Sequence, residues 1–326
     1  VTELNPNNGP GDTLTTVPQG TSDVTITPLG FNRGDNFYAI DGGFLAGTDG
    51  VMLATISEGL RDNSATGGYV EYGIASTTFN NEEWQISTAT SNASPGGSTE
   101  FNINHSVAFF GANSGFQSGI DQKVDMVTGV LDFTVSGIDP EANGVLFGNP
   151  ATNEENFLTI TPQGGDGDGW DIALLDNSGE LEQVLNPGDE DGFNWVYLPY
   201  EADNLIAGVS QADGSLVTST DTNDFSLSKV GLGEYKLTIP GKSPDTGMLL
   251  LNATAEGDGD NSVVYEPHSD GSSFLIIGVD HVTVDEIENQ FLLPNPEDTG
   301  FSFAYIDFEM PPSLAAPISG DFDGDG

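Results

Sequence analysis

The sequence contains no cysteine and very few basic residues. Without cysteine, the chain has no disulfide bonds, cysteine-ligated zinc, iron–sulfur clusters or thiol catalysis. Six Lys and Arg stand against 51 Asp and Glu, a formal net charge of −45, which leaves no basic face for a phosphate backbone or an anionic membrane surface. No apolar run approaches the roughly 20 residues that span a bilayer. We therefore expect neither a nucleic-acid partner nor membrane insertion.

Helical spacing of apolar residues is also scarce, whereas alternation of apolar and polar residues recurs along the chain. Short alternating runs bounded by Gly, Asn, Asp and Pro include residues 24–27, 131–135 and 235–239, and such runs are typical of strands. Residues 282–291 alone show weak helical spacing, enough for about two turns. The sequence predicts an all-β fold. Its 326 residues suit two or three β-modules of roughly 100 residues better than one small core.

An internal repeat divides the chain into about three copies. Each copy opens with Gly followed by apolar residues, continues to an aromatic-x-Ile element and ends in an aromatic-rich strand. The openings are residues 49–53, 143–147 and 246–250, the middle elements begin at Trp84, Trp170 and Phe274, and the last strands lie within 101–110, 193–197 and 301–306. We predict that Gly50, Gly144 and Gly247 stand at equivalent strand entrances. The period of roughly 95 to 105 residues is the size of a β-sandwich.

The repeat predicts tandem β-sandwich modules of jelly-roll-like form. Strands with consecutive apolar residues, such as 248–251, should be buried on both faces, which requires two sheets or close packing between modules. The predicted organisation is an extended N-terminal arm at 1–22, module 1 at 23–115, module 2 at 116–204, module 3 at 205–310, and a Pro-rich linker with the start of a calcium loop at 311–326. The arm either adds a strand to another copy or folds back onto its own module.

Residues 321–326 (DFDGDG) match the first half of a calcium loop. Asp321, Asp323 and Asp325 place carboxylates at alternate positions, and Gly326 stands at the sixth position, where the loop turns. The second half of such a loop is not part of this sequence. An acidic flexible tail is therefore the alternative interpretation.

Two Asp-Gly segments, 165–169 and 257–261, are further candidates for calcium binding. Asp166 and Asp168 in the first, and Asp258 and Asp260 in the second, bring several carboxyl oxygens together on a flexible backbone. Ordinary turn chemistry explains Asp-Gly pairs equally well, so both interpretations stay open. Calcium is the cofactor that the sequence favours.

The Pro-rich linker followed by residues 318–326 (ISGDFDGDG) resembles the entry to a dockerin-like calcium repeat of secreted, multi-module proteins of planctomycete-type bacteria. The runs GMLLL at 247–251 and FSFAYIDF at 301–308 are similar to uncharacterised extracellular β-modules of such proteins. This resemblance implies an exported, calcium-rich setting and brings no activity with it. The start at Val1 rather than Met fits either removal of a leader or trimming of the chain, and we expect a secreted or cell-surface location.

Residue patterns for catalysis are few. The sequence has no Gly-x-Ser-x-Gly elbow, His-Glu-x-x-His motif or phosphate-binding Gly loop. His105 lies in a predicted strand, where a structural role is the expectation. Trp84, Trp170 and Trp195 are anchor positions of the repeat, so we expect them to pack in cores rather than to stack on sugars. The sequence does not predict an enzyme.

Two functions from different classes remain. The sequence favours a secreted structural protein that self-associates into a filament, lattice or coat and is stabilised by calcium. The alternative is a carbohydrate-binding or adhesion module of a larger secreted enzyme, with polysaccharide as its partner. A high-order species in light scattering would favour the first function, and retention on a glycan array as a monomer would favour the second.

Overall fold

The computed structural model describes parts of all three predicted modules. It gives side chains for residues 49–57, 84, 86, 105–120, 131–151, 157–164, 169–175, 192–256, 259, 261–280 and 296–314, and only the backbone of the strand residues outside these ranges. Every helix or strand assigned in this part of the chain is a strand, which confirms the all-β prediction.

Each predicted module contains a Gly-led strand paired with an aromatic-rich strand. The antiparallel pairs are β5 (Gly50–Ile56) with β10 (His105–Gly111), β13 (Gly144–Pro150) with β16 (Phe193–Pro199), and β21 (Gly247–Ala253) with β27 (Phe301–Asp307). In every pair the leading glycine faces the last residue of the partner strand. Gly50, Gly144 and Gly247 therefore stand at the same register position, as the repeat predicts.

A second set of strands accompanies each of the three Gly-led pairs. The pairs that follow the Gly-led strands are β8 (Gly73–Asn80) with β9 (Glu83–Thr90), β14 (Asn156–Pro162) with β15 (Trp170–Asp176), and β22 (Asn261–Pro267) with β23 (Phe274–Asp280). The outer neighbours of β9, β15 and β23 are β4 (Asp35–Asp41), β12 (Val130–Phe133) and β20 (Glu234–Thr238). Trp84, Trp170 and Phe274 lie at the start of equivalent strands of these sheets.

Two strands begin just after the predicted boundaries at 116 and 205. β11 (Gln117–Asp121) pairs with β16, and β17 (Ile206–Ser210) pairs with β27, so both join the module that follows them in the chain. One sheet nevertheless crosses the second boundary, because β14 pairs with β21 in parallel and the order runs β12-β15-β14-β21-β27-β17-β18. The boundaries between modules stay a prediction, and we keep the modules as labels.

The remaining strands lie at edges or in short pairs. They are β1 (Thr2–Glu3), β2 (Thr15–Thr16), β3 (Thr25–Asn32), β6 (Arg61–Asn63), β7 (Tyr69–Glu71), β18 (Leu216–Ser219), β19 (Ser226–Gly231), β24 (Val284–Asp285), β25 (Gln290–Phe291) and β26 (Asn295–Pro296). In the arm, β1 pairs with β2, while β3 pairs with β4 of its own module. Whether the arm also reaches another copy stays open.

The weak helix predicted at 282–291 is wrong for the residues that the structure describes there. β24 and β25 pair with each other antiparallel, Val284 facing Phe291 and Asp285 facing Gln290. Each strand offers a β-branched or aromatic residue to the other, and this pairing outweighs the local helical spacing.

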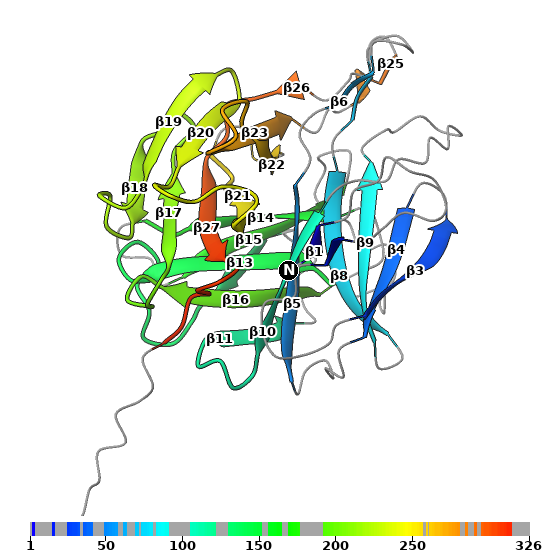
Figure 1. The fold of residues 1–326 in the computed structure, drawn as a ribbon, viewed down its shortest axis with the longest axis horizontal. Coiled ribbons are helices and arrows are strands. Elements are labelled where there is room, and N and C mark those ends of the chain that lie inside the picture. Colours follow the sequence, from blue (N-terminus) through cyan, green and yellow to red (C-terminus); the bar gives the residue numbers. More distant parts are fainter. Residues whose placement is uncertain are drawn as a thin grey trace, which may run out of the picture.

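The Gly-led strands are buried on both faces, as expected from their consecutive apolar residues. In β13, Leu146 packs into the core of its own module with Trp170 and Phe193, whereas its neighbours Val145 and Phe147 enter a shared core. The shared core also takes Val51 and Leu53 from module 1 and Met248, Leu250 and Ile306 from module 3. Figure 1 shows β13 and β16 crossing the middle of the molecule, between the β3-β4-β9-β8 sheet and the strands of module 3.

Candidate functional site: the junction of the three modules

The three Gly-led strands contact one another where they end. The sixth residue of each strand points into this junction, and it is Thr55 in β5, Asn149 in β13 and Asn252 in β21. All three side chains are buried, with 5 to 8% exposed. Burial of a carboxamide costs free energy unless its donor and its acceptor are both paired. We therefore expect the donor and the acceptor of each buried asparagine side chain to have a partner at this junction.

Each of the two asparagines pairs with one residue of the preceding module. Asn149 Oδ1 accepts from the N–H of Ala54 (2.6 Å), and its Nδ2 donates to the carbonyl oxygen of the same residue (3.0 Å). Asn252 does the same to Gly148, with both distances 3.0 Å. Ala54 and Gly148 are each the fifth residue of a Gly-led strand. We call these two-bond contacts the amide clamps.

A half-open cavity of about 50 Å³ lies beside the amide clamps. Its lining combines polar side chains with the ends of strands from all three modules. The lining residues are Ala54, Thr55, Ile56, Gly148, Asn149, Pro150, Phe157, Leu158, Leu251, Asn252, Ala253, Ser262 and Val263. Ser262 is 8% exposed, and its hydroxyl has no hydrogen-bond partner. A buried hydroxyl in such a position favours a polar occupant in the cavity.

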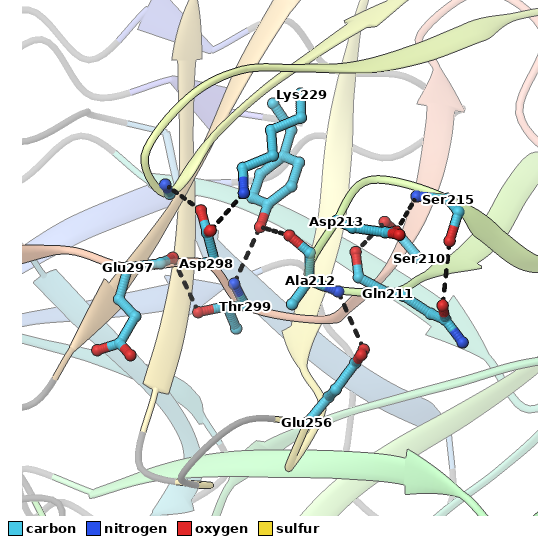
Figure 2. Close-up of polar contacts among 12 residues, drawn as sticks. Ser210, Gln211, Ala212, Asp213, Ser215, Lys229, Glu256, Glu297, Asp298 and Thr299 are labelled. Atoms are coloured by element: carbon cyan, nitrogen blue, oxygen red, sulfur yellow. Dashed lines mark hydrogen bonds and ion pairs between the residues drawn. The ribbon is translucent and has the colours of Figure 1, made fainter.

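A second polar cluster lies in module 3 around the buried Tyr235, and Figure 2 shows its members Ala212, Glu256 and Thr299. The Tyr235 hydroxyl donates to the carbonyl oxygen of Ala212 (2.7 Å) and accepts from the N–H of Thr299 (2.9 Å). The N–H of Ala212 donates to Glu256 Oε2 (3.0 Å). Burial raises the pKa of Tyr235 to about 12, against the opposing effect of the Thr299 N–H. The phenol is therefore neutral at ordinary pH and joins the turn of Ala212 to the segment of Thr299.

Three lysines of module 3 each pair with an aspartate. Asp298 accepts from the N–H of Gly233 and from Lys229, which together lower its pKa. Lys236 Nζ lies 2.6 Å from Asp270 Oδ2, and this contact is the main reason that the pKa of Asp270 falls well below its usual range. These side chains are partly exposed, so the pairs contribute little to stability individually.

The pair of Lys242 with Asp307 is the most buried of the three on its acidic side. The Asp307 side chain is 6% exposed, and it also accepts from the N–H groups of Glu309 (2.8 Å) and Met310 (3.1 Å). Burial acts to raise the pKa of Asp307, but Lys242 and the two N–H groups outweigh it and lower that pKa. Asp307 therefore anchors the segment that leaves β27.

The seven aspartates predicted as calcium ligands all lie outside the described residues. They are Asp166, Asp168, Asp258, Asp260, Asp321, Asp323 and Asp325. Of the 257–261 segment, the structure describes Gly259 and the buried Asn261, whose side-chain amide has no hydrogen-bond partner. Among the described residues, no group of three or more His, Asp or Glu side chains is arranged to hold a metal ion. The calcium sites stay predictions.

The aromatic and histidine predictions fall on described residues. Trp84 and Trp170 are buried in cores, as predicted, with at most 1% exposed. Trp195 is partly buried and packs edge-on against Phe133 at a centroid distance of 5.1 Å. His105 is 1% exposed in β10, in agreement with a structural role. No motif marks Asn149 and Asn252 in the sequence, although an alignment of the copies from their leading glycines places both at the sixth position.

The searches against known proteins find no matching family model, no matching curated protein and no matching solved structure. In the part of the chain that the structure describes, no helix is long and apolar enough to cross a membrane.

Proposed function

We propose that the protein is a non-enzymatic structural subunit of an extracellular or cell-surface assembly, which associates with further copies of itself and is stabilised by calcium. The observation that carries the proposal is the shared core, which draws buried residues from all three predicted modules. Modules joined by a common core and by buried amide clamps move as one body, because separating them would expose apolar surface and unpaired backbone groups. Such a block suits a load-bearing subunit.

Two edge strands of module 3 support self-association. β18 ends the seven-stranded sheet and β19 ends the sheet formed with β20, β23 and β22. Val217 in β18 is 44% exposed, Val230 in β19 is 50% exposed, and Leu232 in the turn after β19 is 67% exposed. Unpaired edge strands that carry exposed apolar side chains are surfaces to which another strand adds. Figure 1 shows both strands on the outer side of module 3.

Light scattering and electron microscopy of the purified chain test the proposal, with calcium and with magnesium at equal ionic strength. We expect assemblies whose size grows with protein concentration. Val217→Lys and Val230→Lys should reduce assembly, because a lysine on an edge strand blocks strand addition. Met310→Lys is the matched control, since Met310 is 54% exposed and lies outside any strand. A wild-type chain that stays monomeric under all conditions, or is retained on a glycan array as a monomer, would contradict the proposal.

A further inference from the structure

The packing of the modules is cyclic. β13 of module 2 lies against β8 of module 1, β21 of module 3 lies against β14 of module 2, and β5 of module 1 lies against β22 of module 3. Each Gly-led strand thus contacts β8, β14 or β22 of another module, the first strand of the pair that accompanies the Gly-led strand there. Junctions 1–2 and 2–3 join modules that follow each other in the chain. A third junction, 3–1, joins the last module to the first and closes the ring.

The amide clamps occupy only the two consecutive junctions. Asn149 clamps Ala54 at junction 1–2, and Asn252 clamps Gly148 at junction 2–3. The equivalent pair at junction 3–1 is Thr55, the sixth residue of β5, and Leu251, the fifth residue of β21. Both line the cavity. A threonine hydroxyl is shorter than a carboxamide and is a single group, so it does not bond the N–H and the C=O of one residue side by side.

The backbone of Leu251 is oriented like that of Gly148. Leu251 faces Phe303 of β27 in the same register in which Gly148 faces Trp195 of β16. In an antiparallel ladder both polar groups of a residue point to the same side, and the N–H and C=O of Gly148 point to Asn252 rather than to Trp195. Equal register therefore directs the N–H and C=O of Leu251 toward junction 3–1.

A second difference enlarges the space at this junction. Ser262 is the second residue of β22, whereas the second residue of β14 in module 2 is Phe157. The serine leaves room that a phenyl ring would fill. Ser262 lines the cavity, and its buried hydroxyl has no hydrogen-bond partner. A cavity needs about 10–15 Å³ to hold one water molecule, and this one measures about 50 Å³.

We propose that ordered water occupies the position of the third carboxamide, between Thr55, Ser262 and the backbone of Leu251, and that junction 3–1 is the junction at which the ring opens first. Besides the shared core, the contacts that close this junction include the hydrogen bond between Ser106 Oγ and Tyr265 OH (2.9 Å) and the apolar cluster with Ile56 and Val264. These contacts close the ring without fixing the backbone of Leu251 through a protein side chain.

Native-state amide hydrogen exchange tests this proposal directly. In the wild-type chain the amide of Leu251 should exchange faster than the amides of Ala54 and Gly148 after correction for intrinsic rates, because water exchanges with bulk and a clamp does not. Thr55→Asn should slow the exchange of Leu251 about tenfold, the factor that one net hydrogen bond supplies, and raise the midpoint of thermal unfolding.

Two further variants separate the clamp from a general effect of size. Thr55→Asp has the shape of asparagine but offers no donor to the C=O of Leu251 and carries a charge that burial penalises, so it should lower the thermal midpoint, the opposite of Thr55→Asn. Asn149→Thr should make the amide of Ala54 exchange as fast as that of Leu251, a readout that does not depend on how Thr55→Asn folds. The proposal is wrong if Leu251 exchanges as slowly as Ala54 and Gly148 in the wild-type chain, or if Thr55→Asn and Thr55→Asp behave alike.

Discussion

At the scale of single residues, the molecule depends on buried polar side chains whose partners are backbone groups far away in the sequence. Asn149 pairs with a residue 95 positions away, and Asn252 with one 104 positions away. A buried hydrogen bond contributes modestly when it is made, but removal of one partner leaves the other desolvated and unpaired. Loss of either asparagine should therefore lower the free energy of unfolding by more than its two hydrogen bonds contribute when they are made.

Asn252→Ala should lower the free energy of unfolding by about 2–4 kcal/mol, because the N–H and the C=O of Gly148 both lose their buried partner. Urea unfolding followed by circular dichroism measures the change. Asn223→Ala is the matched control, since Asn223 is exposed and bonds only the neighbouring Asp221, and it should change stability by less than about 0.5 kcal/mol. Equal effects of the two substitutions would contradict the role of the amide clamps.

Tyr235 gives a prediction for alkaline pH. Its pKa of about 12 in the folded state lies above the ordinary tyrosine value of 10.0, chiefly because the phenol is buried. The stability linked to Tyr235 is therefore fully present below pH 10.0 and is lost as the pH rises toward about 12. Tyr235→Phe should lower stability by about 1–3 kcal/mol at pH 8, since the buried N–H of Thr299 loses its acceptor.

The same substitution should also make the loss of stability between pH 10 and 12 smaller than in the wild-type chain. Chemical unfolding at pH 8 and at pH 11 measures both effects. A variant with unchanged stability at pH 8 and the wild-type dependence on alkaline pH would show that the Tyr235 cluster does not contribute to folding.

At the scale of elements, the Gly-led strands are defined by how closely a partner strand approaches their first residue. A Cβ atom added at Gly144 would lie 2.3 Å from the carbonyl oxygen of Leu198, and one at Gly247 would lie 2.3 Å from the ring of Tyr305. Gly50 combines such a contact with a φ of +146°, which disfavours any side chain. The repeat of glycine in the sequence thus records a repeated steric requirement.

Gly144→Ala and Gly247→Ala should each destabilise the protein by about 1–3 kcal/mol, because the first contact is with the backbone of a buried strand and the second is with the ring of the buried Tyr305. Gly111→Ala provides the comparison, since its added Cβ would have ordinary contacts at 3.7 and 3.9 Å. Differential scanning calorimetry of the three variants gives the ranking. If Gly111→Ala is as destabilising as the other two, the close approach at the strand entrances is not the cause.

At the scale of the whole molecule, the net charge of −45 opposes compactness. The six basic residues neutralise only a small part of the acidic charge. Three of these six, Lys229, Lys236 and Lys242, pair with aspartates of module 3. The remaining carboxylates repel one another, and salt screens this repulsion over roughly 10 Å at 0.1 M. Ions should therefore act on stability in two ways, by general screening and, at the predicted calcium sites, by specific binding.

Calcium at fixed ionic strength should raise the thermal midpoint more than magnesium does, and chelation should reverse the gain, because an ion bound only by the folded state stabilises it by mass action. The predicted ligands give the test variants, Asp166→Asn with Asp168→Asn and Asp258→Asn with Asp260→Asn, which should reduce the specific gain. An equal gain from magnesium or sodium chloride, or a calcium response unchanged in both double variants, would mean that screening alone acts at these segments.

The sequence by itself determined the strands, the register position of the leading glycines and the burial of their apolar neighbours, because period-two patterns are local and the leading glycine recurs in each copy of the repeat. It led to a wrong helix at 282–291, since local spacing carries no information on the partner that Val284 finds in Phe291. Only the tertiary structure decided that Asn149 and Asn252 clamp other modules while Thr55 does not. A buried amide takes its role from the backbone that the fold brings opposite it, and that backbone lies about a hundred residues away.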